Sequence, residues 1–410
     1  MKGKIMATGI AFDGKQYAGN PHARSDDGEV ASATPRRGSL LYKKELTLAL
    51  MCTLCLAAFA REPWKSDVPD DEVEWIDGAA LPIEGRGFSP DNPDDTYARL
   101  PAALRAAPDI ARISRMATSS TGLNFRFKTD SDLMRLRWVL QRDPPYGRGV
   151  ATGLASAGVD VYSWFSGHGW RFWLNDFPRA RTNTLDVMWV PGRACTIYLP
   201  LFSRVEGFSV GIKKGTSISK ARPHALGKPV VVYGTSVVNG YSSSRPGMLW
   251  TSILGRMLDV DVINQGYSGN GKLEESMLEF LGGIDAAAYC FLCCGEQQTI
   301  ETMREIYRPF LERLHKRRPE TPILIGEYYW VNGPDAFAFE KPKRDFIADL
   351  VAELKDADRE FWRNLHIVRM KDMIVPDGDG TFDYAHVNDL GARQIAVAFA
   401  DVLRRTLGID

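Results

Sequence analysis

The stretch Val230-Val231-Val232-Tyr233-Gly234-Thr235-Ser236 decides how the C-terminal half of this chain folds. Four apolar residues in a row predict a strand buried on both faces, as in a parallel sheet covered by helices. Segments of strand and helix character then alternate to the end of the chain, which indicates an α/β domain with a parallel sheet. The expected strands are 230–233, 260–263, 288–292, 322–325 and 366–368, and the expected helices are 247–258, 273–281, 300–317, 343–361 and 390–407.

The sequence that precedes this stretch has a different pattern. Residues 125–128 and 134–138 alternate apolar and polar side chains, and this period of two is typical of half-buried strands. Pro and Gly separate the short segments, and short strands at this spacing predict an antiparallel β-sandwich. We therefore expect a β-sandwich domain at 61–225, followed by the α/β domain at 226–410.

The N-terminus has the features of a segment that is removed. Residues 1–38 are polar and indicate either a disordered segment or an over-extended gene start. Two lysines at 43–44 precede an apolar run at 46–59, and small residues end it, so we expect a secretory signal peptide at 39–60. A buried helix or a membrane anchor is the alternative, but a spanning helix needs roughly 20 apolar residues. We therefore expect a secreted or periplasmic protein that is not stably inserted in the membrane after cleavage.

Charge and cysteine content argue against several classes of protein. Lys and Arg together number 51, and so do Asp and Glu, so the chain lacks the basic surplus that a nucleic-acid binder needs. Cys290, Cys293 and Cys294 have a spacing seen in redox and zinc sites, but they lie on and just after an expected buried strand without a second ligand pair. Small core residues are the favoured interpretation, and we expect no metal and no cofactor.

Three polar residues near the ends of expected strands are candidates for catalysis. Ser236 directly follows the first strand, where ligands of α/β proteins bind, although a helix cap is the alternative role. Asp383 and His386 are three residues apart in a turn-rich loop before the last helix. A serine hydroxyl becomes nucleophilic when a His takes its proton and a carboxylate orients that His. A surface loop or a Ca²⁺ site is the alternative for the acidic loop, which lacks the spacing of an EF-hand.

Three short motifs follow expected strands in this half of the chain: Gly234-Thr235-Ser236, Ser268-Gly269-Asn270 and Asp383-Tyr384-Ala385-His386. Together these motifs resemble the SGNH (GDSL-like) hydrolases. The resemblance covers about 228–407 and extends to a branch of the family that tends to carry a β-sandwich before the hydrolase domain. It implies a flavodoxin-like, three-layer α/β/α hydrolase domain with a parallel sheet, preceded by a jelly-roll-like β-sandwich. The branch is indicated by Ser244-Arg245-Pro246-Gly247 and Asn388-Asp389-Leu390-Gly391.

The resemblance implies a role for each residue of the site. Ser236 would attack an ester carbonyl, His386 would take and return its proton, and Asp383 would orient His386. The backbone N–H groups of Ser236 and Gly269 would stabilise the oxyanion, and the reaction would need no cofactor.

The sequence departs from the family at one position. The family has an Asn after the third strand whose amide is a further oxyanion donor, and Glu296 falls there in this chain. A carboxylate cannot donate a hydrogen bond unless it is protonated, and losing one such donor typically costs about 10²–10³ in rate. Gln297, Gln298 or Asn270 could supply the amide instead.

The sequence leaves several functions open. An esterase that removes small acyl groups, such as acetyl, from carbohydrate is the favoured hypothesis, with an acylated small molecule or glycan as substrate. A thioesterase or lysophospholipase could use the same triad, and a carbohydrate-binding protein with a weakened hydrolase domain would explain Glu296. Trp164, Trp170 and Trp173 could stack on sugar rings, although a place in the sandwich core is favoured because aromatic residues dominate core burial.

Overall fold

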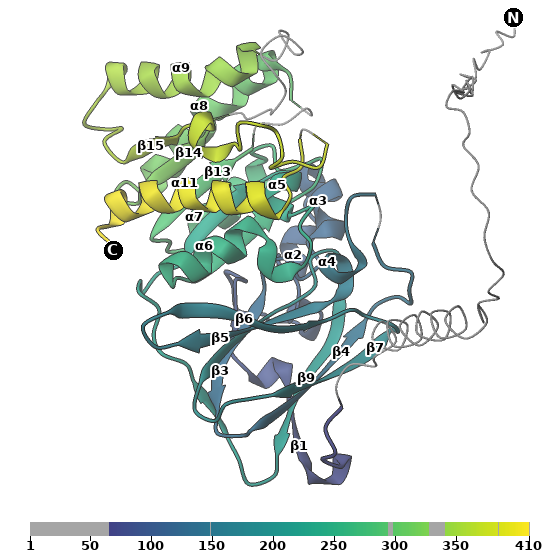
Figure 1. Ribbon diagram of the computed structural model, residues 1–410. Coiled ribbons are helices and arrows are strands. Elements are labelled where there is room, and N and C mark those ends of the chain that lie inside the picture. Colours follow the sequence, from purple (N-terminus) through teal and green to yellow (C-terminus); the bar gives the residue numbers. More distant parts are fainter. Residues whose placement is uncertain (1–64, 148, 294–297, 328–340, 384, 410) are drawn as a thin grey trace, which may run out of the picture. The chain divides into compact units, whose positions relative to one another are not determined.

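The structure is a computed structural model that describes residues 65–410 apart from 148, 294–297, 328–340, 384 and 410 (Figure 1). The expected signal peptide at 39–60 and the polar segment at 1–38 lie outside the described residues. Within the described part of the chain, no helix is both long and apolar enough to cross a membrane.

Two antiparallel sheets form the first half of the described chain (Figure 1, blue to teal). Aromatic and aliphatic side chains from both sheets, among them Phe125, Phe127 and Trp138, fill the space between them. The alternation at 125–128 and 134–138 thus reflects strands with one face in a core. One sheet has the order β1 (Val73–Asp77), β9 (Val205–Lys213), β4 (Leu133–Leu140), β7 (Thr182–Met188), and the other has the order β10 (Ile218–Lys220), β3 (Asn124–Thr129), β8 (Ala194–Tyr198), β5 (Val159–Phe165), β6 (Gly169–Asp176), with β2 (Ile83–Glu84) beside β3.

A parallel five-stranded sheet with helices on both faces forms the second half (Figure 1, green to yellow). The strand order is β12-β11-β13-β14-β15, so the first strand of this half lies between the second and the third. This confirms the α/β fold class with a preceding sandwich. The elements are β11 (Val230–Gly234), α5 (Ser236–Asn239), α6 (Trp250–Leu258), β12 (Val262–Gly266), α7 (Glu275–Gly283), β13 (Ala288–Leu292), α8 (Ile300–Arg317), β14 (Ile323–Gly326), α9 (Lys341–Ala357), β15 (Leu365–Val368), α10 (Met370–Met373) and α11 (Asp389–Leu407).

The apolar run of β11 is continuous because both faces of the sheet are covered. Val231 and Tyr233 pack into a core that includes side chains of α7, α8 and α9. Val230 and Val232 point to the other face and pack with side chains of α6 and α11. The carboxyl end of β11 is also the point where the strand order changes direction, and ligands of open α/β sheets bind at such a point.

Four expected elements differ from those observed by two or more residues at one end or both. The helix expected at 273–281 runs over Glu275–Gly283. The helix expected at 247–258 begins at Trp250, after a 3-10 turn over Pro246–Met248, and the helix expected at 343–361 ends at Ala357. The strand expected at 260–263 runs over Val262–Gly266 and therefore includes two amide side chains. In the sequence these two amides indicate a loop, but in the structure both are buried and hydrogen-bonded. The Asn264 amide donates to the Val238 carbonyl at 2.7 Å, and the Gln265 amide donates to the Arg99 carbonyl at 3.1 Å.

A short helical segment between β2 and β3 packs against the parallel sheet. It comprises α2 (Ala102–Arg105) and α3 (Ala111–Met116), and Ile110 and Ile113 are buried in the same core as Tyr233. Arg99 is fully buried beside this segment and donates to the carbonyls of Met116 at 2.9 Å and Gly266 at 2.6 Å. The segment therefore holds the end of β12 in place. A further short helix, α4 (Gly153–Ala157), precedes β5.

Candidate active site

Ser236 is the first residue of α5, directly after the carboxyl end of β11. A Cβ atom at Gly234 would lie 2.2 Å from the carbonyl oxygen of Leu292 on the neighbouring strand, so only glycine fits there. The φ of Gly234 is not positive, so the close approach of β13 is the reason for the glycine. The strand can then end with Ser236 at the edge of the sheet.

The structure brings Ser236, His386 and Asp383 together in one chain of hydrogen bonds. Nε2 of His386 lies 2.9 Å from Oγ of Ser236, and Nδ1 of His386 lies 2.8 Å from Oδ2 of Asp383. A carboxylate can only accept, so Nδ1 carries a proton and Nε2 of a neutral ring accepts from the Ser236 hydroxyl. The side chains of His386 and Asp383 are 23% and 41% exposed, so the site is open to solvent.

The carboxylate of Asp383 is held in its ionised form. Its Oδ1 atom accepts hydrogen bonds from the backbone N–H groups of His386 at 2.8 Å and Ala385 at 3.2 Å. Partial burial raises the pKa of Asp383, but the hydrogen bonds from the side chain and backbone of His386 outweigh burial and lower the pKa below its ordinary value. The group therefore stays charged at neutral pH and keeps the His386 ring oriented.

The loop that carries Asp383 and His386 is tied to the N-terminus of α11. Asn388 is the N-cap residue of this helix, and its Oδ1 atom accepts from the N–H groups of Leu390 and Gly391 at 3.0 and 3.2 Å. Its amide also donates to the carbonyl of Asp379 at 2.6 Å. Both ends of the loop are thus anchored by one side chain.

The glycine-rich loop after β12 lies against the end of β11. The Tyr267 N–H donates to the Gly234 carbonyl at 2.9 Å, and a Cβ at Gly271 would lie only 2.1 Å from the same oxygen. Gly269 has a φ of +70°, and a Cβ there would meet nothing within 4 Å, so its backbone borders open space. Within the described residues, neither the N–H of Ser236 nor that of Gly269 has an acceptor, which leaves both available to a ligand.

Sequence comparison identifies both halves of the chain. The GDSL-like Lipase/Acylhydrolase family matches residues 227–404, and the N-terminus of the Esterase_SGNH_hydro-type, named GxDLY, matches residues 73–218. This chain belongs to the SGNH (GDSL-like) hydrolases. By family it is a carboxylic ester hydrolase. Residues 158–162 are Gly-Val-Asp-Val-Tyr, which matches the GxDLY motif, with x as any residue, except that Val161 stands in place of Leu. The sequence has no significant match among curated proteins.

Several solved structures share the fold of this SGNH hydrolase. A protein described as a GDSL-like lipase from Bacteroides ovatus ATCC 8483 has a TM-score of 0.70 at 24% identity, over 82% of this chain and 99% of that chain. The salicylyl-acyltransferase SsfX3 from a tetracycline biosynthetic pathway has a TM-score of 0.64 at 16% identity, over 83% and 98%. A family two carbohydrate esterase from Cellvibrio japonicus has a TM-score of 0.52 at 11% identity, over 82% and 98%.

Of the four candidates for a further oxyanion donor in this hydrolase, the structure describes two, Asn270 and Gln298. Glu296 and Gln297 lie outside the described residues. The Asn270 amide donates to the carbonyl of Ser268 at 3.0 Å, within its own loop. Gln298 is buried, and its amide donates to the Lys272 carbonyl at 3.3 Å, which links the loop after β13 to the glycine-rich loop.

Two neighbours of the triad were not singled out from the sequence. Oδ1 of Asn239 accepts from the N–H and the hydroxyl of Ser268 at 3.3 and 3.2 Å, and its amide donates to Thr121 at 3.1 Å. The ring of Tyr241 lies with its centroid 4.8 Å from that of His386. The spacing of three between Ser236 and Asn239, close to one helical turn, is the signal that could have indicated Asn239.

Other residues that the sequence singled out lie elsewhere in the hydrolase. Cys290 is fully buried, and burial raises the pKa of its thiol, as expected of a core residue. Trp170 is buried, whereas Trp164 and Trp173 are half-buried. The part of the chain that the structure describes contains no group of three or more His, Cys, Asp or Glu side chains arranged to hold a metal ion.

Proposed function

We propose that this protein is a secreted or periplasmic serine esterase that removes small acyl groups, such as acetyl, from carbohydrate. Ser236, His386 and Asp383 are its catalytic residues. The single observation that supports this most is the hydrogen-bonded chain from Ser236 through His386 to Asp383, located where the strand order of the sheet changes direction.

The reaction proceeds through an acyl-enzyme. Oγ of Ser236 attacks the acyl carbonyl while Nε2 of His386 takes the hydroxyl proton, and the tetrahedral oxyanion accepts from the N–H groups of Ser236 and Gly269. Collapse of this intermediate breaks the bond to the alcohol, which leaves with the proton from His386. Water then attacks the acyl carbon, His386 takes its proton, and the acid leaves as Ser236 is reprotonated. Asp383 stays ionised throughout and stabilises the imidazolium.

The carbohydrate part of the proposal has separate support. Solved family two carbohydrate esterases share this fold over most of their length, and one from Clostridium thermocellum was solved in complex with cellohexaose. A sandwich preceding the hydrolase half is compatible with a polymeric substrate. The secretory part rests on the charge and apolar pattern at 39–60.

Hydrolysis of p-nitrophenyl acetate by the full chain tests the nucleophile. We expect turnover by the wild-type protein and a loss of about 10⁴-fold or more in kcat for Ser236→Ala, because the remaining groups cannot form an acyl-enzyme. Ser166→Ala, at an exposed serine in the turn between β5 and β6, is the matched control and should retain full turnover.

Two outcomes would contradict the proposal. Equal turnover by Ser236→Ala would place the nucleophile elsewhere. Absence of turnover by the wild-type protein on p-nitrophenyl acetate and on acetylated sugars would favour a carbohydrate-binding protein with an inactive hydrolase domain, consistent with Glu296 at the position of the family's Asn.

A further inference from the structure

A cleft of about 380 Å³ opens directly beside the triad. Asn239, Tyr241 and Ser268 form its inner wall, and these residues contact the triad or the glycine-rich loop. Its outer wall comes from α3, from the end of β4 and from the segment between β8 and β9. A group bound in this cleft would therefore be attached to, or adjacent to, an ester held at Ser236.

The charged groups that line this cleft are all positive. They are the guanidinium groups of Arg115, Arg142 and Arg204, and no carboxylate lies among the lining residues. Arg204 is paired with Asp94 at 3.1 Å. Arg115 and Arg142 are exposed, and in the described ranges neither side chain has an acidic partner within ion-pair distance. The chain as a whole has no net charge, so this gathering of cations is not a consequence of a generally basic composition.

The remaining lining combines polar side chains with aromatic rings. Polar groups such as Gln141, Thr118 and Ser119 line the cleft together with the aromatic rings of Phe202 and Tyr241, whose centroids lie 6.1 Å apart. Polar groups beside a few aromatic rings are suited to hydroxyl groups and the apolar faces of a pyranose ring.

We infer that this cleft binds the alcohol part of the ester, and that this alcohol is an anionic sugar whose acidic group pairs with Arg115 and Arg142. The inference rests on the proposed esterase function and adds the substrate class to it. Guanidinium groups present planar donor forks that match the oxygens of a carboxylate or a phosphate. A cleft lined by one sign of charge also raises the local concentration of ligands of the opposite sign.

Matched substrates that differ at one carbon test this inference. The methyl glycosides of 3-O-acetyl-galactose, 3-O-acetyl-galacturonic acid and 3-O-acetyl-galactose 6-phosphate are neutral, carboxylated and phosphorylated at C6. We expect kcat/KM of the wild-type protein to be about tenfold higher for an acidic substrate than for the neutral one, mainly through KM. Comparison of the two acidic substrates distinguishes a uronic acid from a sugar phosphate. About 0.5 M NaCl should lower the ratio of acidic to neutral kcat/KM, because salt screens exposed charges.

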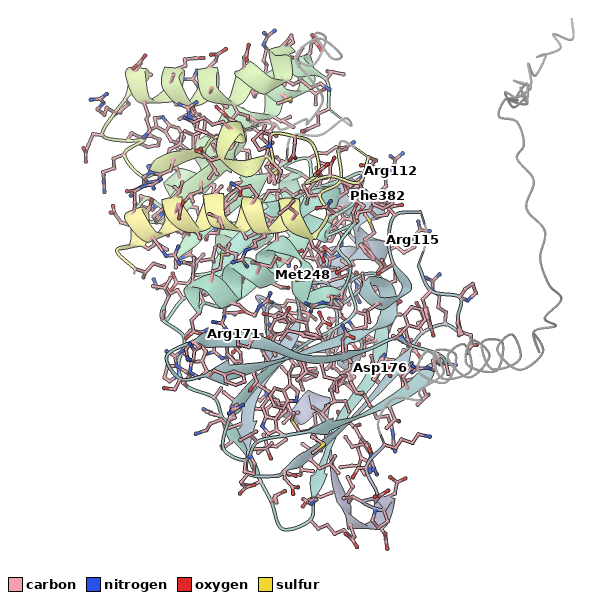
Figure 2. The ribbon with its side chains drawn as sticks, in the orientation of Figure 1. Arg112, Arg115, Arg171, Asp176, Met248 and Phe382 are labelled. Atoms are coloured by element: carbon pink, nitrogen blue, oxygen red, sulfur yellow. The ribbon has the colours of Figure 1, made fainter. Side chains whose placement is uncertain are left out.

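The variant Arg115→Gln with Arg142→Gln should reduce the ratio of acidic to neutral kcat/KM to about one. The ratio is measured on a single preparation, so a partly unfolded sample does not alter it. Arg112→Gln is the matched control, because Arg112 is exposed on the same helix α3 but does not line the cleft (Figure 2). It should leave both the ratio and the hydrolysis of p-nitrophenyl acetate unchanged.

Three results would overturn the inference. The first is equal kcat/KM on neutral and acidic sugars by the wild-type protein. The second is an equal drop in the ratio for Arg112→Gln, which would indicate general surface charge. The third is rapid hydrolysis of p-nitrophenyl acetate without hydrolysis of any of the sugars. Each leaves the serine esterase intact, whereas turnover that persists in Ser236→Ala would refute the proposed function itself.

Discussion

At the scale of a single residue, Asp383 matters through the position of its carboxylate as well as through its charge. Its two oxygens accept three hydrogen bonds from His386 and Ala385, and two of the three donors are backbone N–H groups. These bonds set the position of the carboxylate before any substrate arrives. The position in turn decides which nitrogen of His386 is protonated.

Asp383→Asn should lower kcat for p-nitrophenyl acetate by about 10³–10⁴-fold with little change in KM. The amide can donate to Nδ1 of His386, which favours the tautomer whose proton lies on Nε2 and which cannot take a proton from Ser236. Steady-state kinetics at pH 7 measure the effect. Asp379→Asn is the control, since the side chain of Asp379 is exposed in the same loop, and an equal loss there would argue against the specific role of Asp383.

At the scale of elements, β5 of the sandwich is joined to the segment that precedes α6. Oδ2 of Asp160 accepts from Nη1 of Arg245 at 2.8 Å and from the N–H of Gly247 at 2.6 Å, and the Asp160 side chain is fully buried. Burial raises the pKa of Asp160, and the charge of Arg245 opposes this rise. Ser244, in the same segment, donates to Asp389 at the start of α11. The segment therefore links the sandwich to the helix that anchors the loop of His386.

Asp160→Ala should lower the free energy of unfolding by about 3–5 kcal/mol, because it leaves the guanidinium of Arg245 without its partner in a site that is largely buried. Urea denaturation monitored by tryptophan fluorescence measures this change. A double variant, Asp160→Ala with Arg245→Met, should recover part of the loss since it removes the uncompensated charge. A loss below about 1 kcal/mol in the single variant would mean that the pair is no stronger than an exposed one.

At the scale of the whole described molecule, the sandwich half and the hydrolase half are joined by polar contacts around Asp259. Asp259, at the end of α6, accepts from Arg126 at 3.0 Å, Trp170 at 3.0 Å and Arg222 at 2.5 Å. A small cavity of about 30 Å³ lies next to this cluster. Because three donors from the first half converge on one carboxylate of the second, the relative orientation of the two halves depends on charge as well as on apolar contact.

Asp261, two residues after Asp259, makes the stability of the folded protein depend on pH. Burial and the nearby charge of Glu84 raise the pKa of Asp261 to about 6, from an ordinary value of 3.8. The folded protein thus binds this proton more tightly than the unfolded chain does. The stability that this carboxyl contributes is fully present below pH 3.8 and is lost as the pH rises through about 6.

We expect Asp261→Asn to remove this dependence. The amide oxygen can still accept from the N–H of Gly85, which donates to Oδ1 of Asp261 at 3.0 Å, but the side chain no longer ionises. Relative to this variant, the wild-type protein should lose on the order of 2 kcal/mol between pH 4 and pH 6.5, at about 1.4 kcal/mol per pKa unit. Thermal unfolding across that range measures the difference, and parallel curves for the two proteins would refute the assignment. Asp285→Asn, at an exposed residue, is the control.

The elements with a strong local signal could be predicted from the sequence. Helix α8 has the expected limits, 300–317, because apolar residues recur at helical spacing and Thr299 caps its first turn. The strands β11 and β13 could also be predicted from the sequence, because a short apolar run between turn residues is typical of a buried strand. The limits of β12 were wrong because its two amides are buried only by virtue of partners such as Val238 and Arg99, which no local pattern reveals.

The residue types of the candidate site were also visible, but their arrangement was not. The sequence by itself determined that a serine follows a buried strand and that an Asp and a His lie three apart before the last helix. Only the tertiary structure decided that His386 reaches across 150 residues to Ser236, that Asp160 pairs with Arg245, and that arginines from distant segments line one cleft. Apolar periodicity and helix capping act between near neighbours in the chain, whereas these pairings depend on how strands and helices pack in space.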